Sequence, residues 1–336
     1  MATEDIYSDI LNEHQTVDEL ITDYHVTQKA IRWPIEAALE SAVKVSYRNQ
    51  LATQLADESA EVISRRYVYM TEATMSELVD LVEQNLLEQP LQGYGIELGS
   101  GCALLAAVAA KRANVKAVMG LEVCENFDVL IQIVAASVLG KDATKVVPVI
   151  GSFDDLRIPD NSLDFAVEHD SLHHSDNLAR SMTECARVLK PGGVLICFDR
   201  CHPNSVTDDD VNTMLDHVYS PHFLKANGYP SDIVLTRREN GEHEYRLFEW
   251  EAAAKTAGLE FTRRCEFHKR ITFKKAAKGV ISLFPNPIRK KWGVNKDCDL
   301  ASTRKWVSQR LQAFNSDPDD MLAPKQTTVM IFTKPK

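Results

Sequence analysis

The sequence predicts an α/β protein: a seven-stranded, mostly parallel sheet with helices on both faces, a helical N-terminal extension and inserted cap segments. Three observations predict it. From Gly95 to Phe198, short apolar stretches alternate with stretches of helical periodicity. Short turns that contain glycine connect these stretches. In residues 1–88, apolar side chains recur every three or four positions, which is the spacing of a helix. Strand–helix alternation with short connections is typical of a parallel sheet that is covered on both faces.

The predicted strands are short and apolar. We expect them at residues 96–98, 117–121, 146–150, 163–167, 194–198, 259–267 and 327–333. Helices are expected at residues 103–112, 127–139, 178–189 and 247–257. Pro191, Gly192 and Gly193 follow Lys190 and predict a tight turn ahead of the fifth strand.

Four segments organise the predicted fold. Residues 1–90 are expected to form a helical extension or cap, with helical patterns at 6–11, 16–21, 35–45 and 74–87. The remaining segments are a ligand-binding core at 91–200, a cap insertion at 201–246, and the C-terminal part of the core at 247–336 with a basic insertion at 270–324. Loops of this length are usually functional in compact domains. We therefore expect the extension and the insertions to cover a bound substrate.

Charge is distributed unevenly over the chain. The 336 residues are 44% hydrophobic, which allows a large core, and the net charge is −10. This acidic balance opposes binding to nucleic acid, so no nucleic-acid partner is expected. Between Thr262 and Arg310, however, Lys and Arg outnumber Asp and Glu by 14 to 3. Such a basic island predicts an anionic substrate, an anionic membrane surface, or a solvated face that balances acidic neighbours.

Cysteine usage and the N-terminus favour a cytoplasmic protein. The seven cysteines form no C-x-x-C pair and no spacing typical of a zinc site or a disulfide framework. No apolar run approaches the roughly 18 residues of a membrane span. The acidic N-terminus lacks the basic and apolar regions of a secretory signal. We expect reduced thiols, and a homodimer remains an open option.

A glycine turn is the central motif of the sequence, at Ile96-Glu97-Leu98-Gly99-Ser100-Gly101. A strand that runs into a glycine turn and then a helix lets backbone N–H groups approach a ligand closely. About 20 residues on, Glu122 ends the second predicted strand with a carboxylate that can accept hydrogen bonds from both hydroxyls of a ribose. The loop lacks the third glycine of a dinucleotide site, which argues against NAD.

Two further segments complete a known pattern: Gly151-Ser152-Phe153-Asp154 after the third strand, and Arg187-Val188-Leu189-Lys190-Pro191-Gly192-Gly193 before the fifth. With the glycine turn, they resemble the class I S-adenosylmethionine-dependent methyltransferases of the small-molecule type with an "RVLKPGG" turn. The resemblance covers residues 93–200 well, and 245–267 and 325–335 loosely. It implies a Rossmann-like fold and S-adenosylmethionine as the cofactor.

The resemblance also implies which residues bind the cofactor: Glu97, Gly99, Ser100, Gly101, Glu122, Ser152, Phe153 and Asp154. The chain departs from the family at Ser152, where the family has Asp directly after the glycine. The adenine amino group could therefore meet Asp154, the Ser152 hydroxyl or water. Phe153 is expected either on the adenine ring or in the core.

Methyl transfer from a sulfonium is an in-line displacement, in which an oxygen or nitrogen acceptor must lose a proton. Ligands of open α/β sheets lie beyond the carboxyl ends of the strands, so polar residues there are catalytic candidates. After the fourth and fifth strands the chain reads Glu168-His169-Asp170-Ser171-Leu172-His173-His174 and Asp199-Arg200-Cys201-His202.

These two stretches supply the predicted catalytic and substrate residues. We predict His169 or His174 as the general base, with Glu168, Asp170 and Asp199 orienting the substrate. We also place Arg200 and His202 at the substrate, and expect His173 to shape the wall beside the cofactor. A cluster of Glu, His and Asp could hold a divalent metal, but no spacing is diagnostic and we predict no metal.

The predicted function is methyl transfer to an O or N atom of a small molecule, such as a sugar, a nucleotide-sugar, a lipid-linked acceptor or a secondary metabolite. Basic side chains from Arg263 to Lys275 could clamp a phosphate. Residues 270–310 could instead contact a membrane surface peripherally. The alternatives are an RNA or protein methyltransferase, and a non-catalytic relative that only binds the cofactor.

Overall fold

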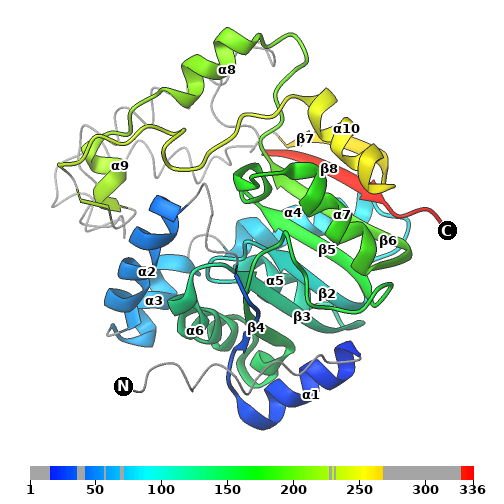
Figure 1. The fold of residues 1–336 in the computed structure, drawn as a ribbon. Coiled ribbons are helices and arrows are strands. Elements are labelled where there is room, and N and C mark those ends of the chain that lie inside the picture. Colours follow the sequence, from blue (N-terminus) through cyan, green and yellow to red (C-terminus); the bar gives the residue numbers. More distant parts are fainter. Residues whose placement is uncertain are drawn as a thin grey trace, which may run out of the picture. The chain divides into compact units, whose positions relative to one another are not determined.

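The computed structural model describes residues 16–35, 42–56, 58–68, 72–226, 229–230, 232–267 and 327–336. Within them lies an eight-stranded sheet of order β1-β4-β3-β2-β5-β6-β8-β7 (Figure 1). Strand β2 pairs in parallel with β3 on one side and with β5 on the other, so Glu97 lies between Gly120 and Val167. The strand order reverses at β2, and ligands of such sheets bind at the carboxyl ends beside this reversal.

Buried apolar residues define the strands. They span Ile31–Arg32 (β1), Gly93–Leu98 (β2), Val115–Glu122 (β3), Val146–Ile150 (β4), Leu163–His169 (β5), Leu189–Asp199 (β6), Glu260–Phe267 (β7) and Thr327–Thr333 (β8). All of β4 is buried, as expected of a parallel strand with a layer on each face. Apart from Asp164, β5 is apolar until it ends at the buried Glu168 and the exposed His169, where the candidate site begins.

Helices lie on both faces of the sheet (Figure 1). They span Val17–Thr27 (α1), Ala42–Ala56 (α2), Ala60–Tyr67 (α3), Glu72–Asn85 (α4), Leu104–Ala110 (α5), Asp128–Leu139 (α6), Leu178–Val188 (α7), Asp208–Leu215 (α8), Pro221–Ala226 (α9) and Leu247–Ala257 (α10). Helices α1, α7 and α10 share an apolar cluster with Ile96 and Leu98. Glu97, between them, reaches α5 instead. Because successive strand residues point to opposite faces, α5 belongs to the other layer, where it contacts α4 and α6.

Several predicted elements are confirmed with their bounds: the strands at 146–150 and 327–333 and the helix at 247–257. The sheet has one strand more than predicted, because Ile31 and Arg32 pair with Val149 and Ile150 at its edge. Two residues are too few to show a periodic pattern, so the sequence does not reveal this strand.

The predicted turn at 190–193 lies inside a strand. β6 begins at Leu189, which pairs with Leu163, and Val194 pairs with Phe165, so the residues between bulge out of the ladder. Gly192 has a φ of +82°, which glycine adopts at little cost. Its N–H donates to the carbonyl of Lys334 at 2.8 Å. The glycine is needed for a bulge rather than for a reversal.

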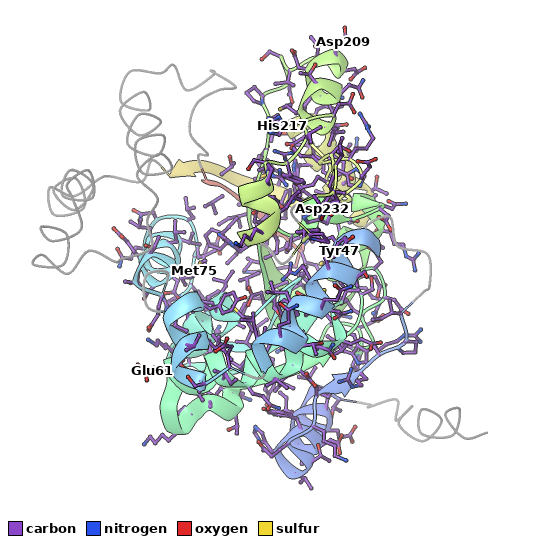
Figure 2. The ribbon with its side chains drawn as sticks, turned by 90° about the vertical axis from the view of Figure 1, so that its left-hand side faces the viewer. Tyr47, Glu61, Met75, Asp209, His217 and Asp232 are labelled. Carbon is purple, nitrogen blue, oxygen red and sulfur yellow. The ribbon has the colours of Figure 1, made fainter. Side chains whose placement is uncertain are left out.

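The insertion at 201–246 contains α8 and α9 and contacts the N-terminal extension. Leu224, Tyr229 and Leu235 form an apolar cluster against which Tyr47 of α2 packs. The rings of Tyr47 and Tyr229 are 5.0 Å apart. Figure 2 shows Tyr47 beside the part of the insertion that carries Asp232. Two segments far apart in sequence therefore pack together.

The chain divides into two compact units, Met1–Cys265 with Val329–Lys336, and Glu266–Thr328. The helical pattern at 6–11 and the basic insertion at 270–324 lie outside the described residues, as does the predicted membrane-contact segment 270–310. None of the helices in the described residues is long and apolar enough to cross a membrane.

Candidate functional site

A crevice opens at the carboxyl ends of β2, β3 and β4. Its lining comprises Gly99, Leu121, Val123, Gly151, Ser152, Phe153, Asp154, His174 and Asp176. Apart from Leu121, which lies in β3, these residues come from the segments that follow four different strands, so only the parallel sheet brings them together. The crevice thus lies where ligands of open α/β sheets bind.

The glycine turn forms one wall of this crevice. Gly99 and Gly101 have φ values of +60° and +53°, which disfavour any side chain. A Cβ atom at Gly99 would stand 2.6 Å from the Cβ of Ser171. Ser171 cannot easily move, because its hydroxyl donates to the carbonyl of Leu98 at 2.7 Å. Glycine is therefore required at position 99 for close packing of the turn against the loop after β5.

Glu122 occupies a cradle of backbone N–H groups at the end of β3. Its Oε2 accepts from Gly101 N at 2.7 Å, and Oε1 accepts from Val123 N and Cys124 N at 3.1 Å each. Arg48 of α2 brings a guanidinium nitrogen to 3.8 Å from Oε2. The carboxylate is almost completely buried. Three backbone N–H groups and a guanidinium therefore hold the Glu122 carboxylate in place between Leu121 and Val123, which line the crevice.

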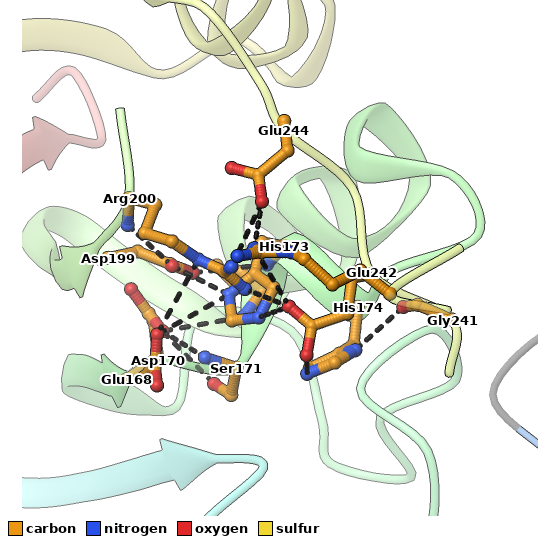
Figure 3. Close-up of polar contacts among 12 residues, drawn as sticks. Glu168, Asp170, Ser171, His173, His174, Asp199, Arg200, Gly241, Glu242 and Glu244 are labelled. Atoms are coloured by element: carbon orange, nitrogen blue, oxygen red, sulfur yellow. Dashed lines mark hydrogen bonds and ion pairs between the residues drawn. The ribbon is translucent and has the colours of Figure 1, made fainter. Parts of the chain in front are cut away.

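His173, in the loop after β5, lies between the carboxylates of Asp199 and Glu242 (Figure 3). Its Nδ1 is 2.7 Å from Asp199 Oδ1, and its Nε2 is 3.5 Å from Glu242 Oε2. Burial lowers the pKa of His173, but the charge of Asp199 and the hydrogen bonds to both carboxylates outweigh burial and raise it. The ring is therefore suited to hold a proton, and neither nitrogen is turned to the crevice.

His174 has the opposite character. Its Nδ1 is 2.6 Å from the carbonyl oxygen of Gly241, which can only accept, so Nδ1 carries the hydrogen. Nε2 then bears the lone pair, and it contacts Nζ of Lys44 on α2. Burial and the charges of Lys44 and His173 lower the pKa of His174 well below its usual value. A neutral imidazole with an acceptor nitrogen therefore stands in the crevice wall.

Comparison with known proteins identifies this part of the chain. Residues 96–197 match the family model described as a methyltransferase domain. The matched segment runs from β2 into β6 and includes the glycine turn, Glu122 and both histidines. This segment is therefore similar to a methyltransferase domain.

Curated relatives match the methyltransferase domain over a short stretch. The glycine/sarcosine/dimethylglycine N-methyltransferase of Actinopolyspora halophila is 31% identical over 94 residues, which are 28% of this chain and 17% of that protein. The demethylmenaquinone methyltransferase of Listeria monocytogenes is 33% identical over 87 residues, 26% of this chain and 35% of that protein. The chain thus spans about a third or less of the length of these relatives.

Solved structures resemble the chain more broadly. The [4+2]-cyclase SpnF is 16% identical, covers 91% of this chain and 99% of its own, and has a TM-score of 0.51. The phosphoethanolamine N-methyltransferase 2 of Haemonchus contortus is 14% identical, covers 83% of this chain and 60% of its own, and has a TM-score of 0.47. The likeness to SpnF shows the fold, and a shared fold does not fix the reaction.

The crevice of the methyltransferase domain fits its cofactor. Within the described residues, the buried hydroxyl of Ser100 has no hydrogen-bond partner, so it can bind a polar group of a ligand. The carboxylate of Glu122 has about four acceptor positions, and three N–H groups leave capacity for a ribose hydroxyl. Ser100, Glu122 and the turn at Gly99 would therefore hold S-adenosylmethionine, whose chemistry is the donation of a methyl group.

The other predicted cofactor residues divide into two groups. Ser152, Phe153 and Asp154 line the crevice, and Phe153 also packs against the core, so both roles predicted for it are compatible. The carboxylate of Asp154 already accepts from the Ser181 hydroxyl. Glu97 is absent from the lining, as are Ser100, Gly101 and Glu122, but it is also turned to α5: its Oε2 accepts from Ala106 N at 2.7 Å, and burial raises its pKa to about 8. The structure corrects its role to supporting α5.

Three predicted catalytic residues lie away from the crevice lining. Glu168 is fully buried, and its Oε2 accepts from both the N–H and the hydroxyl of Ser171. Burial and the charge of Asp199 raise its pKa well above the usual value, so Glu168 shapes the loop as a neutral acid instead of orienting a substrate. His169 and Asp170 are exposed at the end of β5, and Asp170 has a φ of +56°. Between the two predicted bases, only His174 lines the crevice.

The predicted substrate residues after β6 instead hold the cap insertion. Arg200 and Arg237 both pair with Glu242 and Glu244, which are buried (Figure 3). His202 Nε2 is 2.5 Å from Glu244 Oε2. Two guanidinium groups compensate two buried carboxylates, which would otherwise be costly to remove from water. Arg200 and His202 therefore anchor the insertion, while Asp199 orients His173.

Sequence reasoning did not find Lys44, Arg48, Glu242 or Glu244. Lys44 and Arg48 lie in a helix of the extension, and the two glutamates in an irregular part of the insertion. The spacing of four residues between Lys44 and Arg48 places both on one helix face, which is the one signal in the sequence. It does not show what that face contacts.

Among the residues that the structure describes, two sets of side chains have the composition of a metal site. The first is His173, His174 and Glu242, and the second is Asp170, His173 and Asp199, with ligand atoms within 4.8 Å of one another. However, Arg200 and Arg237 pair with Glu242, and Lys44 contacts His174. These cations occupy acceptor positions and would repel a divalent ion. We therefore interpret the cluster as an ion-pair network.

Proposed function

We propose that this protein transfers the methyl group of S-adenosylmethionine to an oxygen or nitrogen atom of a small molecule, with His174 as the general base. The single observation behind this proposal is the neutral imidazole of His174 in the crevice wall beside the turn at Gly99. The cofactor supplies an electrophilic methyl group when bound. The match to the methyltransferase domain supports the class of reaction.

His174 suits removal of a proton from a hydroxyl or amine acceptor. As the acceptor lone pair forms the bond to the methyl carbon, the bond between carbon and sulfur breaks and its electrons remain on sulfur. The acceptor proton passes to Nε2, because Nδ1 already donates its hydrogen to Gly241. The resulting imidazolium lies 4.0 Å from Glu242 Oε1, whose negative charge stabilises it. Lys44 must then leave Nε2 and find another partner when the acceptor enters.

A small acceptor is supported by the segments beside the crevice. The carbonyl of Gly241 in the insertion accepts a hydrogen bond from His174, and Lys44 of α2 contacts the same ring. The two segments also pack together through Tyr47 and Tyr229. Because the insertion and α2 both lie against His174, they leave room for a discrete small molecule more readily than for a strand of RNA or a folded protein. Anionic and lipid-linked acceptors remain within the proposal, and a cytoplasmic location is favoured by free thiols such as Cys102.

The test is a methylation assay with wild-type protein, His174→Gln and His169→Gln. Each protein receives radiolabelled S-adenosylmethionine and a panel of sugars, nucleotide-sugars, amino acids, phenols and lipid-linked sugars, with and without EDTA. We expect His174→Gln to lower kcat by roughly 10²- to 10⁴-fold, the usual contribution of a general base. His169→Gln, an exposed control from the same loop, should keep wild-type kcat. Binding of S-adenosylhomocysteine should be similar in all three proteins.

The pH profile gives a second readout. Because burial lowers the pKa of His174 below 6.5, the acidic limb of kcat should lie below that pH. Full turnover in both histidine variants would reject a histidine base. Cofactor binding by the wild type without transfer to any acceptor would favour a non-catalytic relative.

A further inference from the structure

Lys44 brings a positive charge to His174 in the crevice wall. Its side chain is partly buried, and the contact that the structure shows for its ammonium is the Nε2 atom of neutral His174. Within the described residues, Lys44 makes no ion pair with a carboxylate. An ammonium removed from water is costly unless a charge of opposite sign compensates it. Burial and the nearby charge of Arg48 lower the pKa of Lys44 to about 8, and they outweigh the opposing charges of Glu242, Asp170 and Glu122, none of which comes within ion-pair distance.

Arg48, one turn further along α2, is a second cation for comparison, and it has an ion-pair partner. Its guanidinium lies 3.8 Å from the carboxylate of Glu122 and over the ring of Phe127. Arg48 also lies close to the glycine turn, since a Cβ atom added at Gly101 would stand 3.2 Å from its guanidinium. Residues four apart lie on the same helix face. One face of α2 therefore carries two cations: Arg48 pairs with Glu122, whereas Lys44 contacts neutral His174 and feels carboxylates only from beyond ion-pair distance.

The chemistry of the surroundings favours one kind of anion. A single ammonium beside a neutral imidazole supplies one full positive charge and point-like donors. That matches a carboxylate, whereas phosphate groups are commonly held by bidentate arginine or by several donors. The guanidinium of Arg48 is already paired with Glu122, so it leaves Lys44 as the cation available.

We propose that Lys44 is the counter-ion of a carboxylate that a ligand carries into the crevice. This inference rests on the proposed function, since that function requires Lys44 to leave His174 Nε2 when the acceptor enters. The carboxylate has two possible sources: the amino-acid end of the cofactor, or a carboxylate of the acceptor. In either case the ligand gives the ammonium a partner and frees the base.

Isothermal titration calorimetry with two nucleosides separates the sources. S-adenosylhomocysteine carries the amino-acid end, and 5′-methylthioadenosine lacks it. The proteins are wild type, Lys44→Met and, as a matched control, Lys255→Met, which removes an exposed lysine from α10. Thermal unfolding checks that all three are folded. If the cofactor supplies the carboxylate, Lys44→Met weakens S-adenosylhomocysteine binding about tenfold or more and leaves 5′-methylthioadenosine unchanged.

A second arm tests the acceptor. Each protein, saturated with S-adenosylhomocysteine, is titrated with acetate as the carboxylate probe, with chloride at equal ionic strength as reference. If the acceptor supplies the carboxylate, acetate raises the unfolding temperature of wild type and Lys255→Met but not of Lys44→Met. The inference is overturned if Lys44→Met equals wild type in both arms while both nucleosides bind. A wild type without affinity for either nucleoside would overturn the proposed function, and this inference with it.

Discussion

Replacement of Gly99 by alanine tests the packing on which the crevice depends. The added methyl group would stand 2.6 Å from Cβ of Ser171 and 3.1 Å from its Oγ. Ser171 is held by hydrogen bonds to Leu98 and Glu168, so it cannot move aside without breaking them. The backbone at Gly99 also has a φ of +60°, where an L side chain is strained.

The two effects have separable magnitudes. A side chain in the left-handed region costs roughly 1–2 kcal/mol. Forcing one extra carbon into a packed site costs roughly 1–3 kcal/mol more. We therefore expect Gly99→Ala to lower the free energy of unfolding by roughly 2–5 kcal/mol, which corresponds to a fall of several degrees in Tm. The shift of the turn should also weaken binding of S-adenosylhomocysteine.

Gly258→Ala is the matched control. Gly258 ends α10 with a φ of +74°, and a Cβ atom there would meet nothing within 4 Å. It should therefore show the backbone strain alone, roughly 1–2 kcal/mol, with normal ligand binding. The assay is thermal unfolding by circular dichroism together with calorimetric titration of S-adenosylhomocysteine. Equal Tm values for the two variants, with wild-type ligand affinity for Gly99→Ala, would show that the close approach to Ser171 is wrong.

Two further substitutions test the carboxylates of the core. Burial raises the pKa of Glu97 to about 8, so the folded state holds a proton that the unfolded chain, with a pKa near 4.5, releases. Stability should fall as the pH rises from about 5 to 8, and Glu97→Gln should remove most of that slope, worth up to a few kcal/mol in urea titrations. An unchanged slope would show that Glu97 is ionised in the fold. Glu122→Gln should weaken S-adenosylhomocysteine binding about tenfold, because a charged acceptor bonds a hydroxyl more strongly than an amide. Glu72→Gln, which alters only a surface pair with Lys111, should bind normally; equal affinities would remove Glu122 from the ribose site.

Much of the cofactor side of the site could be predicted from contiguous motifs. Gly99 and Gly101 follow a strand directly, and Glu122 ends the next strand in the chain, so strand order alone places them at one edge. Local spacing also predicted β4, β8 and α10 with their bounds. It did not predict the fate of Glu97, because motif position does not say which face of a strand a side chain occupies.

The catalytic side depended on contacts between distant segments. The residues after β5 are polar in the sequence, but only the fold separates a buried Glu168, an exposed His169 and a His174 that lines the crevice. The different protonation of His173 and His174 follows from burial and from Asp199, Glu242 and Lys44, which lie tens of residues away along the chain.

Some features of this protein depend only on short contiguous stretches of sequence. They are the strand order, the glycine turn and the acidic residue at the strand end, and the sequence by itself predicts them. Which imidazole holds a proton and which accepts one is different, since a pKa reflects burial and every neighbouring charge. Those neighbours reach the histidines from α2 and from the end of the insertion, and only the folded chain brings them within contact distance.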